Sequence, residues 1–254
     1  MTKVTIISGF LGAGKTTFIK KLIEEIYKGQ KVVLIENEFG EIGIDGGFLK
    51  DAGVQINEMN SGCICCSLVG DFGKALKQVS HDYAPDMIII EPSGVGKLSD
   101  VIAAVENVKE EADLELENFI TVADATKCKL YMKNFGEFFN NQIEHASCLI
   151  LSHTAGLAEC KLEDCVQRLR ALNTTAPIVT TDWEQLSGEQ LLAAMNQTET
   201  LDSALKNLLE ETEHEHEHDH EHEHHHHDHD HDESCGCHDH DHHHDHDEHD
   251  HHHH

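Results

Sequence analysis

One glycine-rich segment of this sequence has the residue types and spacing to bind phosphate. It reads Gly9-Phe10-Leu11-Gly12-Ala13-Gly14-Lys15-Thr16, a glycine followed after four residues by Gly-Lys-Thr. Glycines let backbone N–H groups point at phosphate oxygens, Lys15 adds positive charge at the β and γ phosphates, and the Thr16 hydroxyl can bind Mg²⁺. We predict a nucleoside triphosphate site whose ligands are Gly9, Gly12, Ala13, Gly14, Lys15, Thr16 and Thr17.

An acidic residue at the end of an apolar run could support the magnesium ion. Residues 87–90 are four consecutive apolar residues, typical of a core strand, and Glu91-Pro92-Ser93-Gly94 follows them. Ligands of open α/β sheets bind beyond the carboxyl ends of the strands. We therefore predict that Glu91 acts with Lys15 and Thr16 in catalysis and on magnesium, and that Gly94 lets its loop approach the γ-phosphate. The alternative is that Glu91 is an ordinary surface acid. Asp45 is a second, weaker candidate for magnesium.

Three thiols lie within four residues, at Cys63, Cys65 and Cys66. Thiolates at this spacing can converge on one ion, and they select zinc, copper(I) or iron–sulfur clusters over magnesium and calcium. Three ligands leave a tetrahedral ion one open position, which suits transfer because an incoming ligand can enter first. The alternative is a group of buried or redox-active thiols without metal. Clustered cysteines of this kind are more often metal ligands than crosslinks in a reducing compartment.

The end of the sequence has the composition of a metal-collecting tail. Residues 213–254 hold 22 of the 25 histidines and 16 of the 48 acidic residues, with Cys235 and Cys237 as a soft pair. Neutral imidazole suits zinc, nickel and cobalt, and each neighbouring carboxylate can accept the second ring N–H. We expect many weak sites that empty below about pH 6 as the imidazoles protonate. A tail that only solvates the protein would not need histidine.

Composition divides the chain at about residue 212 and limits its partners. The tail lacks apolar side chains, so burial cannot offset roughly 1–2 kcal/mol of ordering entropy per residue, and we expect disorder over 213–254. Residues 1–212 are long enough for one sizeable core. A net charge of −30 makes nucleic acid and anionic membranes poor partners. No apolar run reaches the roughly 18 residues of a membrane span, and we expect a cytoplasmic protein.

Short apolar strands alternate with amphipathic helices in residues 1–212. This order predicts an α/β fold of the P-loop NTPase type, with a mostly parallel sheet covered by helices on both faces. We expect strands at 4–8, 31–35, 87–91, 119–123, 149–152 and 178–181. We expect helices at 16–27, 71–80, 98–108, 161–172 and 201–210. The acidic stretch 106–118 is interpreted as a solvated helix face or loop.

Five motifs together resemble one known family. They are Gly9–Thr17 (GFLGAGKTT), Ile35–Asp45 (IENEFGEIGID), Asn60–Cys66 (NSGCICC), Glu91–Gly94 (EPSG) and Gln142–Ala146 (QIEHA). Over residues 1 to about 195 the chain resembles the CobW-type metallochaperones, which are P-loop GTPases. The resemblance implies GTP-driven delivery of zinc, cobalt or another divalent metal to a client metalloprotein. It also implies that Cys63, Cys65 and Cys66 are the metal motif, and that Glu36 and Glu41 could supply oxygen ligands.

The sequence departs from that family in two places. The family's guanine-reading motif, Asn-Lys-x-Asp, falls on Ser152-His153-Thr154-Ala155. The aspartate that would accept hydrogen bonds from guanine is therefore replaced by Ala155 in this sequence. Losing a charge-assisted hydrogen bond of that kind costs roughly 1.5–3 kcal/mol. Ser152 and His153 remain candidate nucleotide contacts, and the choice between GTP and ATP stays open. The family's usual C-terminal domain has no counterpart, and the histidine tail stands where it would begin.

These observations predict a nucleotide-hydrolysing metallochaperone, with GTP favoured. Its tail would raise the local metal concentration, the thiol cluster would take the ion, and the nucleotide state would control release. Zinc is slightly favoured over nickel and cobalt because of the thiols. The alternative function is a metal buffer whose nucleotide site is weak or vestigial. A homodimer is left open.

Overall fold

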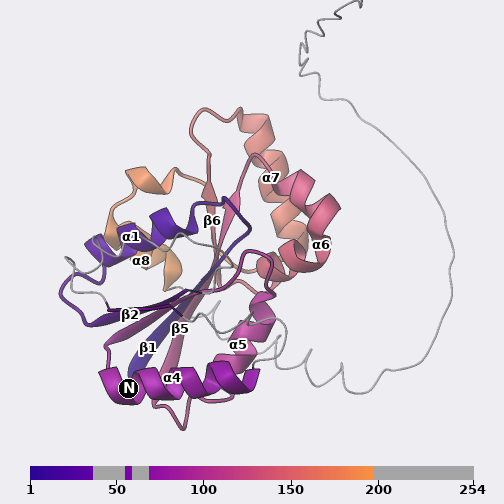
Figure 1. Ribbon diagram of the computed structural model, residues 1–254. Coiled ribbons are helices and arrows are strands. Elements are labelled where there is room, and N and C mark those ends of the chain that lie inside the picture. Colours follow the sequence, from indigo (N-terminus) through magenta and orange to yellow (C-terminus); the bar gives the residue numbers. More distant parts are fainter. Residues whose placement is uncertain (37–54, 59–68, 197–254) are drawn as a thin grey trace, which may run out of the picture. The chain divides into compact units, whose positions relative to one another are not determined.

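The structure is a computed structural model that describes residues 1–36, 55–58 and 69–196 (Figure 1). Its strands are β1 (Thr2–Ser8), β2 (Val32–Glu36), β3 (Gln55–Glu58), β4 (Met87–Glu91), β5 (Leu114–Asp124), β6 (Cys148–Ser152) and β7 (Ile178–Val179). Its helices are α1 (Lys15–Glu25), α4 (Val69–Tyr83), α5 (Leu98–Glu106), α6 (Cys128–Glu144), α7 (Glu159–Leu172), the short 3₁₀ helix η1 (Trp183–Gln185) and α8 (Gly188–Met195).

Seven strands of the described residues form one sheet in the order β3-β2-β4-β1-β5-β6-β7. Neighbouring strands are parallel throughout, with register pairs such as Thr5↔Ile89 between β1 and β4 and Asp124↔Ser152 between β5 and β6. Parallel neighbours need crossover connections, and the helices supply them. All strands therefore end at the same edge of the sheet, where sequence analysis placed the nucleotide.

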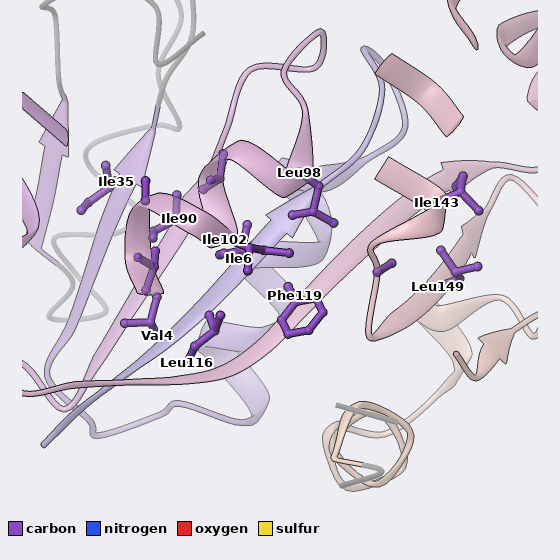
Figure 2. Close-up of a cluster of buried hydrophobic side chains, with 14 of the residues drawn as sticks. Val4, Ile6, Ile35, Ile90, Leu98, Ile102, Leu116, Phe119, Ile143 and Leu149 are labelled. Atoms are coloured by element: carbon purple, nitrogen blue, oxygen red, sulfur yellow. The ribbon is translucent and has the colours of Figure 1, made fainter. Parts of the chain in front are cut away.

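Consecutive residues of the central strands point to opposite faces of the sheet, and each face has its own core. Ile6 packs into one core with side chains of α4, α5, α6 and α7. Figure 2 shows part of this core, including Leu98 and Ile102 of α5 and Ile143 of α6. The next residue, Ile7, packs into the other core with α1, η1 and α8. Both faces of the sheet are covered, as the near-continuous apolar runs of the strands require.

The six predicted strands and four of the five predicted helices are present. Their ends are shifted by no more than three residues, except that β5 begins five residues before the predicted start at 119. The fifth predicted helix, 201–210, and the proposed boundary at residue 212 lie outside the described residues. The interpretation of 106–118 as helix face or loop is wrong for its second half, because β5 begins at Leu114. Leu114 and Leu116 are buried and Glu115 is exposed between them, which is the alternation of a strand covered on one face.

Sequence analysis missed β3, α6, η1 and α8. Helix α6 is the most consequential omission because it lies against the loops at the ends of β1 and β4. Its apolar stripe is interrupted at Phe135, which has non-helical dihedral angles (φ −137°, ψ 30°) where two helical segments meet. A stripe that changes direction at a kink gives a weak periodic signal.

Candidate nucleotide site

The glycine-rich segment joins β1 directly to α1 at the carboxyl edge of the sheet. Gly9 has φ 146°, and a Cβ on it would lie 2.3 Å from the carbonyl oxygen of Val122 in β5. Gly14, with φ 92°, precedes the first residue of α1. A side chain at Gly9 would collide with backbone, and one at Gly14 would be strained. The glycines therefore hold a tight turn whose exit is the N-terminus of an 11-residue helix, an arrangement that favours anions.

Lys15 and Glu91 meet across two adjacent strand ends. The Lys15 Nζ atom lies 3.7 Å from Glu91 Oε1, and the two side chains are only 6% and 4% exposed. Charges this far from water persist only when they are paired or bound to a ligand. The structure therefore brings together the cation and the carboxylate that the sequence predicted separately.

The loop after β4 touches the glycine-rich loop at Gly94. A Cβ on Gly94 would lie 2.9 Å from the backbone nitrogen of Leu11 and 3.4 Å from its Cα. Only a glycine permits this approach without moving one of the two backbones. A shift of the Glu91–Gly94 segment would therefore displace the glycine-rich loop directly.

Helix α6 holds that loop through its last turn. Gln142 is fully buried, and its Nε2 donates to the carbonyl oxygens of Gly94 at 3.0 Å and Gly96 at 2.9 Å. The preceding residue, Asn141, accepts from the Ser99 backbone N–H and donates to the Ser99 hydroxyl. The QIEHA motif thus begins with the side chain that fixes the loop between β4 and α5.

The same helix also contacts the glycine-rich loop through aromatic rings. Phe10 is buried, and its ring centroid lies 4.5 Å from that of Tyr131 and 5.0 Å from that of Phe135. Phe139 completes the group with an edge-on contact at 6.2 Å. Aromatic pairs at these separations contribute about 0.5–1.5 kcal/mol beyond burial. Helix α6 therefore touches both loops that would surround a triphosphate.

A second group of polar residues lies where β5 and β6 end. Ser152 ends β6 and is buried, and His153 follows it with φ 57°, a conformation uncommon outside glycine. In register with Ser152 is Asp124, which is buried at the end of β5. Asp124 Oδ1 accepts from the Thr126 backbone N–H at 2.9 Å and from its hydroxyl at 2.6 Å, and Lys127 Nζ lies 2.8 Å from Oδ2. Asp124 was missed because a single aspartate at a strand end has no motif around it.

Comparison with known proteins identifies the family. The family described as CobW/HypB/UreG, nucleotide-binding domain, matches residues 3–180 of this chain. The chain belongs to this family. The zinc chaperone YjiA of Escherichia coli K12 is 32% identical over 185 residues, which cover 70% of this chain and 56% of YjiA. The zinc chaperone CobW of Sinorhizobium sp is 39% identical over 128 residues, which cover 48% of this chain and 36% of that protein. The chain thus spans about half the length of the curated relatives it matches.

Solved structures agree with the fold of this CobW/HypB/UreG domain. The Zn(II)-bound YjiA GTPase of E. coli is similar with a TM-score of 0.53 and 25% identity, covering 70% of this chain and 57% of YjiA. The hydrogenase maturation factor HypB of Archaeoglobus fulgidus matches with a TM-score of 0.51 and 19% identity, covering 82% of this chain and 90% of HypB. The second likeness supports the P-loop GTPase fold alone.

Several predicted metal ligands of this CobW/HypB/UreG domain lie outside the described residues. These are Asp45, Glu41, Cys63, Cys65, Cys66, Cys235 and Cys237. Glu36 is described, and the sheet register aligns it with Glu58 on one side and Glu91 on the other. Within the described ranges, no three His, Cys, Asp or Glu residues are grouped closely enough to hold a metal ion. The described helices include none long and apolar enough to cross a membrane.

Asp124 gives the first testable prediction, which concerns stability. Burial disfavours its charged form, but the hydrogen bonds from Lys127 and Thr126 outweigh burial and lower its pKa from the ordinary value of 3.8. A carboxyl group whose pKa is lower in the folded than in the unfolded state stabilises the fold at pH values above its unfolded-state pKa. That stabilisation is lost as the pH falls through its folded-state pKa. We expect Asp124→Asn to reduce the free energy of unfolding at pH 7 by about 1.5–3 kcal/mol.

Urea unfolding at several pH values tests this expectation. The difference between the wild-type chain and Asp124→Asn should be constant above about pH 5 and shrink below about pH 4. Asp164→Asn is the matched control, since the pKa of Asp164 is also lowered, by a hydrogen bond from Arg168, but its side chain is 52% exposed. Exposed pairs contribute about 0–1 kcal/mol. An equal loss in both variants would contradict the assignment.

Trp183 gives a second prediction, an optical one. It is the single tryptophan of the chain, and it packs edge-on against Phe18 of α1 at 5.4 Å. Its Cζ2 atom lies 3.9 Å from the position a Cβ on Gly14 would take. A triphosphate ordered by the glycine-rich loop should alter the surroundings of the indole, so we expect a saturable change in its fluorescence when GTP is added. Trp183→Phe should lose the signal, and unchanged emission under calorimetrically proven binding would contradict the expectation.

Proposed function

We propose that this chain is a GTP-hydrolysing metallochaperone domain that binds a transition metal, with zinc favoured, and passes it to a client metalloprotein. The observation that carries the proposal is the convergence of Lys15 and Glu91, both buried, at the exit of a glycine-rich loop. Membership of the CobW/HypB/UreG family and likeness to two proteins named zinc chaperones support it. Metal delivery by this chain and the identity of the client belong to the proposal.

The chain's own residues supply the phosphate chemistry by binding and positioning. Backbone N–H groups of residues 12–16 would surround the β-phosphate, and Lys15 would leave Glu91 to meet the β and γ oxygens. Thr16 and Glu91, with Asp45 as a further candidate, would hold Mg²⁺, which neutralises charge on the phosphates. Gly94 lies against Leu11, so the loop after β4 would sense whether a γ-phosphate is present.

The arrangement of the sheet supports coupling between nucleotide and metal. Glu36, Glu58 and Glu91 occupy one register row across β2, β3 and β4. Cys63 follows Glu58 by only five residues, a length of chain that spans at most about 17 Å. Three thiols tethered so close to this row of carboxylates would be able to respond to the loop that follows β4. Glu36 and Glu41 would add oxygen ligands.

The histidine tail would collect the metal before the thiols take it. Tethering 22 imidazoles to the domain raises the ion's effective concentration near the cluster without any new contact. Hydrolysis would then weaken the thiol site and release the ion to the client. Cytoplasmic location and the tail's lack of fixed structure are parts of this proposal.

Zinc affinity in three nucleotide states tests the proposal and is our third prediction. Chelator competition with no nucleotide, a non-hydrolysable GTP analogue and GDP should give at least about a tenfold difference in affinity, roughly 1.4 kcal/mol of coupling. A chain ending at Thr212 should keep that difference while losing most of its total zinc stoichiometry. Lys15→Ala should keep the stoichiometry and lose the difference. Equal affinity in all three states would contradict metal delivery.

A second candidate function is a metal buffer with a weak nucleotide site. One observation favours it: the loop after β6 carries His153 and Ala155 where guanine-reading relatives have lysine and aspartate. Titration of GTP and of ATP, followed by calorimetry and by the fluorescence of Trp183, separates the two candidates. Comparable apparent affinities for GTP and ATP would indicate relaxed base choice. No response to either would favour the buffer.

A further inference from the structure

Two buried cysteines from different helices, Cys128 and Cys165, are in contact with each other. Cys128 is the first residue of α6, Cys165 lies in α7, and the two are 37 positions apart in the chain. Their Sγ atoms are 3.0 Å apart, and the residues are 2% and 3% exposed. Figure 1 shows α6 and α7 side by side. The remaining described cysteines are a buried one in β6, Cys148, and an exposed one in α7, Cys160.

The surroundings make the two sulfurs unequal. The Cys128 thiol also lies 3.3 Å from the carbonyl oxygen of Asp124, which is an alternative acceptor for its single S–H when Cys165 is not a thiolate. The hydrogen bond between the sulfurs lowers the pKa of Cys165. This effect, with a smaller one from Arg168, outweighs burial and the nearby Asp164 and Asp124, which raise that pKa. The same bond, burial and the nearby Asp124 raise the pKa of Cys128. Cys165 is therefore the sulfur that carries negative charge more readily, and a thiolate is the reactive form of cysteine.

We propose that Cys128 and Cys165 form an oxidisable dithiol whose reactant is a hydroperoxide and whose product is a disulfide between α6 and α7. The Cys165 thiolate attacks one oxygen of hydrogen peroxide, the O–O bond breaks, hydroxide leaves, and Cys165 becomes a sulfenic acid. The Cys128 sulfur then attacks Cys165 Sγ, the S–O bond breaks, and the sulfenic oxygen leaves as water with the proton of Cys128. Overall two thiols lose two electrons and two protons, and one peroxide becomes two waters.

The two sulfurs are already in contact before this step. A disulfide needs the sulfurs about 2.05 Å apart, so they must approach by about 1 Å from their present separation. The link would fix the N-terminus of α6, which also carries Lys127 beside Asp124 and Tyr131 against Phe10. Oxidation would therefore restrain the helix that touches both loops of the nucleotide site. This inference holds whether or not the proposed function does.

Peptide mapping of the full chain tests the proposal. After hydrogen peroxide treatment and alkylation of the remaining thiols, cleavage after glutamate places each of the two cysteines on its own peptide, 118–137 and 164–184. We expect these two peptides to be recovered joined, two hydrogens lighter than their sum. The melting temperature of the oxidised chain should rise by about 5–10 °C, because the link closes a long loop of the unfolded chain.

Variants and a denatured control decide the outcome. Cys165→Ala and Cys128→Ala should abolish the joined peptide and the shift in melting temperature, whereas Cys148→Ala should retain both. Urea at about 8 M denatures an ordinary domain. Oxidation under that condition should give far less of the joined peptide, because unfolding removes the contact between the two cysteines. Two conditions would overturn the proposal: the peptides remain separate at a peroxide dose that already oxidises the exposed Cys160, or they join equally well in urea.

Discussion

Replacing Lys15 by alanine is expected to reduce the rate of phosphate release from GTP by at least about 100-fold. Positively charged groups aimed at transferring phosphates act where charge develops in the transition state, and removing one typically costs about 10²–10³ in kcat. Lys15 is the single lysine of the glycine-rich loop, and it lies buried 3.7 Å from Glu91. Phosphate release with and without zinc, at saturating GTP, measures the effect.

A lysine on the same helix provides the matched control for that experiment. Lys21 also belongs to α1, but it pairs with Glu25, and the two side chains are 14% and 38% exposed. Lys21→Ala should change the rate by less than about twofold, because Lys21 lies beyond the glycine-rich loop and pairs with the solvent-accessible Glu25 and not with Glu91. Thermal unfolding should show that both variants remain folded. Turnover by Lys15→Ala at the wild-type rate would contradict a hydrolytic role and favour the metal buffer.

The sequence predicts the sheet and the phosphate loop because local physics decides them. Apolar runs such as 87–90 form strands that are buried on both faces of a parallel sheet. Gly9 and Gly14 adopt backbone geometry that other residues cannot adopt without collision or strain. The placement of Lys15 and Glu91 at the same edge of the sheet also follows, because all strands of a parallel sheet end at one edge. These features require no knowledge of distant contacts.

The parts that the sequence does not predict depend on contacts between distant residues. Gln142 is 48 positions from Gly94, and only the packing of α6 brings them together. The contact of Cys128 with Cys165 depends on how α6 lies against α7. Each cysteine by itself looks like an ordinary core thiol in the sequence. The register that aligns Glu36 with Glu91 comes from pairing between strands more than 50 positions apart.

Gln142 provides the second prediction of large effect, because its role is one of positioning. Gln142→Leu keeps a side chain of similar size but removes both hydrogen bonds that hold the Gly94 and Gly96 carbonyls. The loop that these bonds anchor has Glu91 at one end and touches Leu11. A displacement of this loop by about 1 Å would therefore move the groups around the phosphates, and a misplacement of that size can reduce the rate by about 100-fold. We expect kcat to fall by about 10–100-fold.

The division between kcat and KM separates positioning from simple damage to the fold. KM for GTP should change by less than about threefold in Gln142→Leu, since the glycine-rich loop and Lys15 still bind the ground-state phosphates. Gln142→Glu should resemble Gln142→Leu in kcat, because a carboxylate keeps the shape of the amide but has no N–H to donate. Asn134→Ala, at an exposed position on the same helix, should leave both constants unchanged. A rise in KM with unaltered kcat would instead mean that α6 serves nucleotide binding and does not order the loop for hydrolysis.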